Sequence, residues 1–113
     1  MLLMEKIYND LKAEALVETA EDFSQDWCRR SRSWFAVQKK SDSDLSAQAA
    51  IACLQTAQIK LALTHLRKKH VGSIVDSEIE TLRDVKASLE AYLQEQHSIL
   101  SVVPAKTPKP KML

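Results

Sequence analysis

The sequence predicts an all-α protein, with a small three-helix head followed by a long antiparallel helical hairpin. The 113 residues include one glycine and three prolines, so they offer few of the turns that a β-sheet requires. The strong helix formers alanine, leucine, glutamine, glutamate and lysine dominate the chain. Over long stretches, apolar residues also recur at every third or fourth position, which places them on one face of a helix.

The first helix is expected from about Leu2 to Ala15, because apolar residues recur there at every fourth position. The segment LVET (residues 16–19) then interrupts the pattern. Thr19 and Asp22 can satisfy free N–H groups at the start of a second, short helix over residues 20–27. The head therefore begins with one full helix and one short helix.

A third helix is expected from about Arg32 to Lys39, with Ser31 as its N-cap. Four apolar residues of the second and third helices would form a small core that holds the third helix in place. These residues are Phe23, Trp27, Trp34 and Val37. For Phe35 two roles remain open. It either packs against the next helix or contacts a thymine methyl group in DNA.

The character of the chain changes at Leu45, where apolar residues begin to alternate spacings of four and three. Such heptad spacing is typical of helices in coiled-coil packing. The first seam predicts a helix over 45–70, capped by Ser43 or Asp44 and ended by Gly72 in a left-handed conformation. It comprises Leu45, Ala49, Ala52, Thr56, Ile59, Leu63, Leu66 and His70.

A second seam predicts a helix from Asp76 or Ser77 to about Leu100, folded back on the first. It comprises Val75, Ile79, Leu82, Lys86, Leu89, Leu93, Gln96 and Leu100. The chain thus divides into a head over residues 1–43, a hairpin over 44–100 and a Pro/Lys-rich tail over 101–113. The tail has no apolar face and is expected to be disordered.

Both hairpin helices carry further apolar residues beside their seams, and such stripes would be exposed on an isolated hairpin. Exposed apolar stripes often mark an interface, so the pattern favours a homodimer. The residues expected at its interface are Ile51, Leu54, Ile59, Leu63, Leu82, Val85, Leu89 and Tyr92. The alternative is that the head folds down and covers these positions within one chain.

The net charge of +1 says little about partners, but the charge is unevenly distributed. Residues 5–26 hold seven acidic side chains and two lysines, whereas residues 29–40 hold five basic side chains and no acidic one. A local basic strip of this kind favours contact with a polyanion or with an acidic protein surface.

Apolar and small residues over 19–40 have the spacing of a helix-turn-helix. Phe23, Ser24 and Trp27 occupy the second-helix positions, and Trp34 and Val37 occupy those of the third helix. The stretch resembles the repressor-type helix-turn-helix, with two departures. Cys28 replaces the turn glycine, and Arg29 replaces the apolar turn residue that usually follows. Either the turn differs from the usual one, or the head only mimics the pattern.

A longer stretch, IYNDLKAEALVETAEDFSQDWCRRSRSWFAVQKK followed by DLSAQAAIACL, resembles a family of small uncharacterised bacterial proteins. The shared features are a Tyr-x-x-Leu start, Leu-Val, Phe-Ser-x-x-Trp, Arg-Ser-x-Ser-Trp/Tyr and a following lysine. This resemblance covers the chain up to about residue 59. It implies a bacterial origin and a helix-turn-helix-like head, but no particular activity.

Two functions therefore remain open. One is a dimeric DNA-binding transcriptional regulator whose third helix enters the major groove, and the other is a helical adaptor that binds a protein partner. The first is the preferred hypothesis, because helix spacing, basic strip and expected dimer agree with it. The residues expected to face DNA are Arg30, Arg32, Ser33, Gln38, Lys39 and Lys40.

Enzymatic, metal-binding and membrane-spanning functions are not expected. The three histidines lack ligand spacing, the acidic residues form no inward pairs, and one glycine cannot build a phosphate loop. No cofactor is therefore expected. Cys28 and Cys53 form no CxxC motif and are expected to be free, buried thiols in a reducing cytoplasm. No apolar run approaches the ~18 residues that a membrane span requires.

Overall fold

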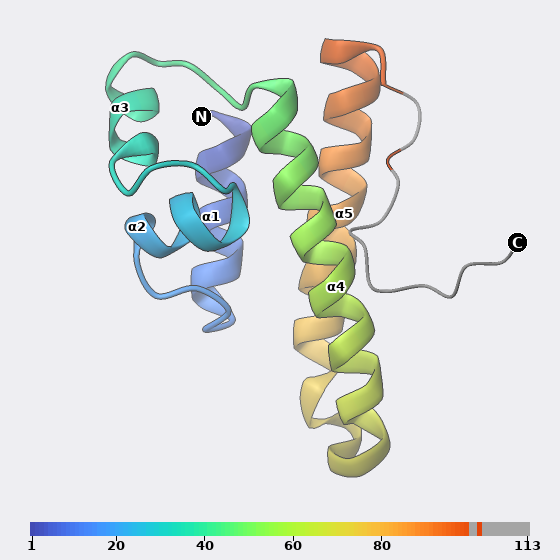
Figure 1. The fold of residues 1–113 in the computed structure, drawn as a ribbon. Coiled ribbons are helices and arrows are strands. Elements are labelled where there is room, and N and C mark those ends of the chain that lie inside the picture. The colour runs from blue at the N-terminus through green and yellow to red at the C-terminus, as the bar shows by residue number, and fades with distance from the viewer. Residues whose placement is uncertain (100–101, 103–113) are drawn as a thin grey trace, which may run out of the picture.

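The computed structural model describes residues 1–99 and residue 102, and these residues form helices and loops without any strand (Figure 1). The predicted all-α class is confirmed. The expected tail over 101–113 lies outside the described residues. The helical elements are α1 (Leu3–Ala13), α2 (Ala20–Asp22), the π-helical turn η1 (Phe23–Trp27), α3 (Trp34–Lys40), α4 (Ala47–Val71), the 3-10 turn η2 (Gly72–Val75) and α5 (Asp76–His97).

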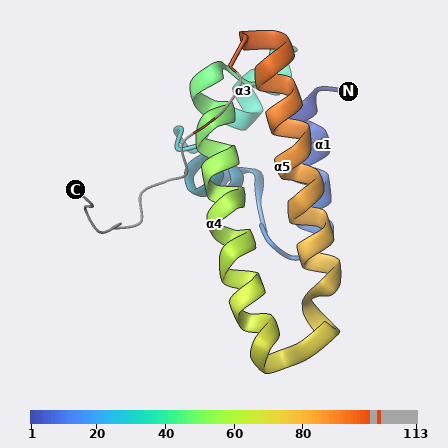
Figure 2. The ribbon, with the colours of Figure 1, turned by 90° about the vertical axis from the view of Figure 1, so that its right-hand side faces the viewer.

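The two long helices form the predicted antiparallel hairpin, and they lie side by side in both views (Figures 1 and 2). Gly72 ends α4 with a φ of 70°, a value that glycine adopts without steric cost. The predicted cap of α4 was wrong, because the Ser46 hydroxyl accepts the Ala49 N–H at 3.1 Å. α5 ends at His97 rather than Leu100, because Ser98 takes a left-handed conformation.

The short helices of the head begin and end differently from the prediction at several points. α1 stops at Ala13, two residues early, because Ala15 has a φ of 59° and turns the chain. Thr19 caps the second helix as predicted, since its hydroxyl accepts the Asp22 N–H at 3.1 Å. Residues 20–27 are helical as expected, but their second half is a π-helix. The third helix begins at Trp34 rather than Arg32, and Ser33 instead of Ser31 occupies its N-cap position.

A single core joins the head to the hairpin. Met4, Ile7 and Leu11 of α1 are buried, as are Phe23 and Trp27 of the second helix. Their side chains belong to the same apolar cluster as buried residues of both long helices, among them Leu54, Leu82, Leu89 and Leu93. The rings of Tyr8, Phe23 and Phe35 lie within 5.0–5.7 Å of one another at the centre of the head. The head is therefore fixed against the hairpin by its own core.

One residue of the predicted head core was wrong. Val37 is 58% exposed, whereas Phe35 is 6% exposed and packs against Tyr8 and Phe23. The Phe35 N–H donates to the buried hydroxyl of Ser24 at 3.1 Å, which holds this residue toward the second helix. The buried face of α3 is therefore formed by Trp34 and Phe35 rather than by Trp34 and Val37.

Much of the apolar surface that the sequence assigned to a dimer interface is buried within one chain. Leu54, Leu82, Val85 and Leu89 belong to the core that the head and both long helices share, so a second copy cannot contact them without opening this core. Among the other expected interface residues, Ile51, Ile59 and Tyr92 are partly buried and Leu63 is exposed. The alternative in which the head folds down is therefore the arrangement of this structure.

Asp44 joins the ends of several helices at one point. Its carboxylate accepts the N–H groups of Leu3 at 2.7 Å and Met4 at 3.0 Å, which lie at the free N-terminus of α1. Its backbone carbonyl accepts the Gln38 amide of α3 at 3.0 Å. The next carbonyl, that of Leu45, accepts the Tyr92 hydroxyl of α5 at 2.6 Å. Burial, and secondarily the charge of Asp44, raises the pKa of that hydroxyl.

We predict that Asp44→Ala lowers the free energy of unfolding by about 1.5–3 kcal/mol, because it removes charge-assisted hydrogen bonds from the α1 N-terminus. Urea denaturation followed by the fluorescence of Trp27 and Trp34 measures the change. Asp84→Ala is the matched control, since Asp84 is exposed on α5 and its loss should cost under about 0.5 kcal/mol. Equal effects of the two substitutions would contradict the role assigned to Asp44.

Candidate nucleic-acid interface

The position of α3 depends on Ser24, whose side chain is fully buried. Its hydroxyl donates to the Ala20 carbonyl at 2.9 Å and accepts the Phe35 N–H at 3.1 Å. One small polar side chain thereby bonds the second helix to the first turn of α3. A bulkier residue at position 24 would separate the two helices, which explains why the helix-turn-helix pattern requires a small residue here.

The turn between the second and third helices differs from the usual one. Cys28 has a φ of −99°, so the missing glycine at this position causes no strain. Arg29 instead takes the left-handed conformation, with a φ of 54°. The turn runs over residues 28–33, which is longer than the three or four residues of a common helix-turn-helix. The head is thus a three-helix unit with a longer turn than the motif it resembles.

Two hydrogen bonds hold this longer turn. The Arg30 N–H donates to the Ser24 carbonyl at 2.8 Å, and the Arg29 guanidinium donates to the Gln55 amide oxygen of α4 at 3.1 Å. The left-handed residue of the turn is therefore supported from the hairpin, and its charge lies close to α4.

All five basic side chains of the strip are exposed: Arg29, Arg30, Arg32, Lys39 and Lys40. Two of them form ion pairs with acidic residues of the head. Arg32 contacts Glu21 at 2.8 Å, and Lys39 contacts Glu5 at 3.7 Å. The hydrogen bond from Glu21, and then its charge, raises the pKa of Arg32. Within the described residues, Arg30 and Lys40 form no ion pair, so the strip keeps uncompensated positive charge.

Of the six residues predicted to face DNA, Gln38 has a role inside the fold. It is partly buried, and its amide donates to the Asp44 carbonyl. The other five, which are Arg30, Arg32, Ser33, Lys39 and Lys40, are exposed as a contact surface would require.

The structure adds two residues that the sequence interpretation missed. Ser33, Ala36, Val37 and Lys40 follow the spacing i, i+3, i+4 and i+7, which places them on one face of α3. All four are exposed, so this face is open to a partner. Val37 was assigned to the core from the helix-turn-helix spacing, which pairs it with Trp34 three positions earlier, but it is exposed while Trp34 is buried.

Cys28, the first residue of the turn, lies next to Cys53 of α4. Both Cys28 and Cys53 are free and buried. A hydrogen bond between the two thiols, followed by burial, raises the pKa of Cys53 well above its usual range. This thiol is therefore protonated at neutral pH and is a poor nucleophile.

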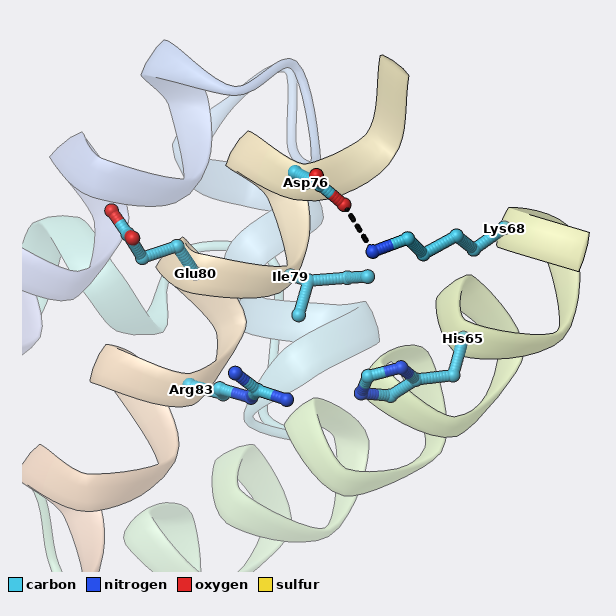
Figure 3. Close-up of a pocket in the computed structure, with 6 residues that line it drawn as sticks. All are labelled: His65, Lys68, Asp76, Ile79, Glu80 and Arg83. Carbon is cyan, nitrogen blue, oxygen red and sulfur yellow. Dashed lines mark ion pairs between the residues drawn. The ribbon is translucent and has the colours of Figure 1, made fainter. Parts of the chain in front are cut away.

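A hollow with a volume of about 290 Å³ lies between the C-terminal part of α4 and the N-terminal part of α5 (Figure 3). His65 and Arg83 project toward each other across it, and Lys68 forms an ion pair with Asp76 at 2.7 Å. Ile79 and Glu80 complete the lining. The hollow is shallow and holds charges of both signs, so its charge does not select a ligand of one sign.

The described residues offer neither a metal centre nor a membrane span. Among residues 1–99 and 102, no cluster of three or more histidine, cysteine, aspartate or glutamate side chains has the geometry to hold a metal ion. The described part of the chain also contains no helix that is long and apolar enough to cross a membrane.

Comparison with known proteins places head and hairpin together in one family. A model of the family of unknown function DUF6626 matches residues 4–102. The chain belongs to this family. The family therefore extends beyond the part of the chain, up to about residue 59, on which the sequence resemblance depended. No curated protein matches the chain, and no solved structure does.

We predict that the stability of the protein falls as the pH rises above about 8.5, the pKa of a cysteine in an unfolded chain. Because folding raises the pKa of Cys53, only the unfolded thiol ionises between 8.5 and the higher folded value. The contribution of the Cys53 thiol to the free energy of unfolding is complete below about pH 8.5 and is lost as the pH rises above it. Urea denaturation from neutral to alkaline pH, with a phosphine reductant, should show a steeper loss for the native chain than for Cys53→Ala. Equal slopes would contradict this coupling.

Proposed function

We propose that the protein binds double-stranded DNA through its head and acts as a transcriptional regulator. The observation that carries this proposal is the exposed face of α3, which combines small and apolar side chains with positive charges at both ends of the helix. α3 lies at the outer side of the head, away from both hairpin helices (Figure 1). A DNA duplex can approach this side without meeting the hairpin.

The dimensions of α3 suit a major groove. Its seven residues span roughly 10 Å at 1.5 Å per residue, and the groove is about 12 Å wide. Ser33 can bond to base edges, and Ala36 and Val37 offer methyl groups to thymine. An apolar residue that is exposed on an otherwise polar helix is explained by such a contact.

The basic residues beside this face suit phosphate groups. Arg30 precedes α3, whereas Lys39 and Lys40 lie in its last turn. The ion pairs of Arg32 and Lys39 are exposed, and exposed pairs of this type contribute at most about 1 kcal/mol. A phosphate can replace either carboxylate at little cost, so the pairs do not prevent binding.

The proposal requires only that a single head binds in a single major groove, without a second copy of the chain. Pairing of two heads through the predicted hairpin interface would need Leu54, Leu82, Val85 and Leu89, which are buried in the core that the head and both long helices share. The alternative function, a helical adaptor for a protein partner, is favoured by a different surface on α4, which is described below.

We predict binding to duplex DNA with a slope of log affinity against log salt near −3 to −4, from about four phosphate contacts at −0.9 each. Lys40→Ala should flatten the slope by about one unit. Val37→Glu should weaken binding more strongly, because it places a carboxylate in the groove while leaving the core intact. Fluorescence anisotropy of a labelled duplex, in a salt series that begins at low salt, measures both effects.

Arg83→Ala is the matched control, because it removes an exposed positive charge from α5 and should leave binding unchanged. An equal loss in Arg83→Ala and Lys40→Ala would mean that only net charge matters. A dissociation constant above ~100 μM at low salt would be weaker than ordinary non-specific association and would contradict the proposal.

A further inference from the structure

α4 carries two apolar seams that have different partners. One seam is Ala50, Leu54, Ala57, Leu61 and Thr64, and its last two members lie in the distal half of α4 (residues 59–71). There they are partly or fully buried, and the neighbouring helix is α5 (Figure 1). This seam therefore faces α5.

The other seam begins beneath the head. Leu45, Ala49, Ala52 and Thr56 are buried, and the Thr56 hydroxyl donates to the Trp27 carbonyl at 3.3 Å. The same spacing of four and three continues with Ile59, Leu63 and Leu66, which we call the distal stripe. Its residues occupy the same face of α4 as the buried ones.

The head does not cover the last two residues of the distal stripe, whereas the first, Ile59, is partly buried. Thr56 is 9% exposed, whereas Leu63 is 52% exposed and Leu66 is 55% exposed. Figure 1 shows the head beside the first half of α4 only, with the second half of that side uncovered. An apolar surface that is buried under the head thus continues into solvent without a break.

The charged side chains that α4 carries beside the distal stripe are all basic. α4 contains no acidic residue from Ala47 to Val71. Its distal half carries Lys60, Arg67, Lys68 and Lys69. Arg67 and Lys68 are paired with Glu78 and Asp76 near the start of α5, while within the described residues Lys60 and Lys69 form no ion pair.

We propose that the distal stripe is a docking site for an amphipathic helix with acidic flanks, supplied by a partner protein. A helix packed along α4 would meet apolar side chains at spacings of four and three, which is the pattern that one helix presents to another. Carboxylates beside its apolar face would lie near Lys60 and Lys69, so the charges are complementary. The partner helix would extend the interface that the head already makes with α4.

Charge also distinguishes this partner from the other possible occupants. Two copies related by a two-fold axis near Leu63 would bring Lys60 of each copy toward Arg67 of the other, and like charges oppose such contact. A helix that binds a lipid surface usually has a broad apolar face with tryptophan or phenylalanine. The stripe has three aliphatic side chains, and α4 contains no aromatic ring of the Phe, Tyr or Trp type.

The test uses a fluorescein-labelled synthetic peptide of about 21 residues, three heptads, with leucine at the a and d positions and glutamate beside them. Anisotropy with the full chain should show binding in the micromolar range. A peptide with lysine in place of glutamate, and a scrambled peptide of the same composition, should bind at least about tenfold more weakly.

Two variants locate the site. Leu63→Ser should weaken binding about tenfold or more, while Val37→Ser, at an equally exposed valine on the head, should not. Lys60→Glu combined with Lys69→Glu should reverse the preference toward the lysine peptide. Circular dichroism should show the same thermal midpoint for Leu63→Ser as for the native chain, because Leu63 lies outside the core.

Several results would overturn the proposal. Equal binding of the glutamate and scrambled peptides would show that charge alone is recognised, and an unchanged affinity in Leu63→Ser would place the contact elsewhere. Sedimentation as a dimer at micromolar concentration, abolished by Leu63→Ser, would show that a second copy occupies the stripe. Co-flotation with vesicles of phosphatidylserine that depends on Leu63, without peptide binding, would show a lipid surface instead.

Discussion

The arrangement of the helices depends on the carboxylate of Asp44. α1 starts after Leu2, which has no polar side chain to accept the first N–H groups of the helix, and Asp44 accepts two of them from 40 and 41 residues away. The backbone carbonyl of the same residue accepts the Gln38 amide of α3, and α4 begins three residues later, at Ala47. Because one residue bonds to α1 through its side chain and to α3 through its backbone, the orientation of α1 is coupled to the segment from which the hairpin begins.

This junction determines how much of the hairpin the head can cover. The head is attached at the start of α4, and its helices are short, so it covers α4 as far as about Thr56. α1 reaches further along α5, where the Glu14 carboxylate accepts the Ser77 hydroxyl at 2.6 Å. The two long helices are therefore covered unequally, and the exposed stripe of α4 follows from the length of the head rather than from a change in the sequence pattern.

The sequence predicted the elements well because their signals are local. Thr19 and Gly72 act within a few residues of their own positions, and heptad spacing requires only one helix. The element that covers a seam cannot be predicted from local signals, because a leucine at a heptad position is buried equally well by α5, by the head or by a second chain. The seam of Leu45 to His70 was therefore predicted correctly as part of one helix, but the head that covers its first half was expected only as the alternative to a second chain, and Leu63 and Leu66 are exposed.

The candidate DNA-binding face could also be predicted only in part, because the orientation of α3 depends on contacts with other elements of the head. Basic residues between 29 and 40 were visible as a cluster, and their exposure follows from their charge. The orientation of α3 could not be predicted in the same way, because it depends on a π-helical turn and on the bond from Phe35 to Ser24. Phe35 and Val37 lie two positions apart, and so about 200° apart around α3, and the one that faces the core is Phe35.

Positive charge alone does not distinguish the two surfaces of this protein, but the side chains between the charges do. On α3 the residues between the bases are Ser33, Ala36 and Val37, which are small enough to let a helix approach base edges closely. On α4 they are the longer aliphatic chains of Ile59, Leu63 and Leu66. A sugar–phosphate backbone is hydrated and cannot bury leucine, whereas the apolar face of another helix can. The two proposed partners would therefore occupy separate surfaces, so the proposal of a DNA duplex on the head is compatible with the proposal of a helix on the hairpin.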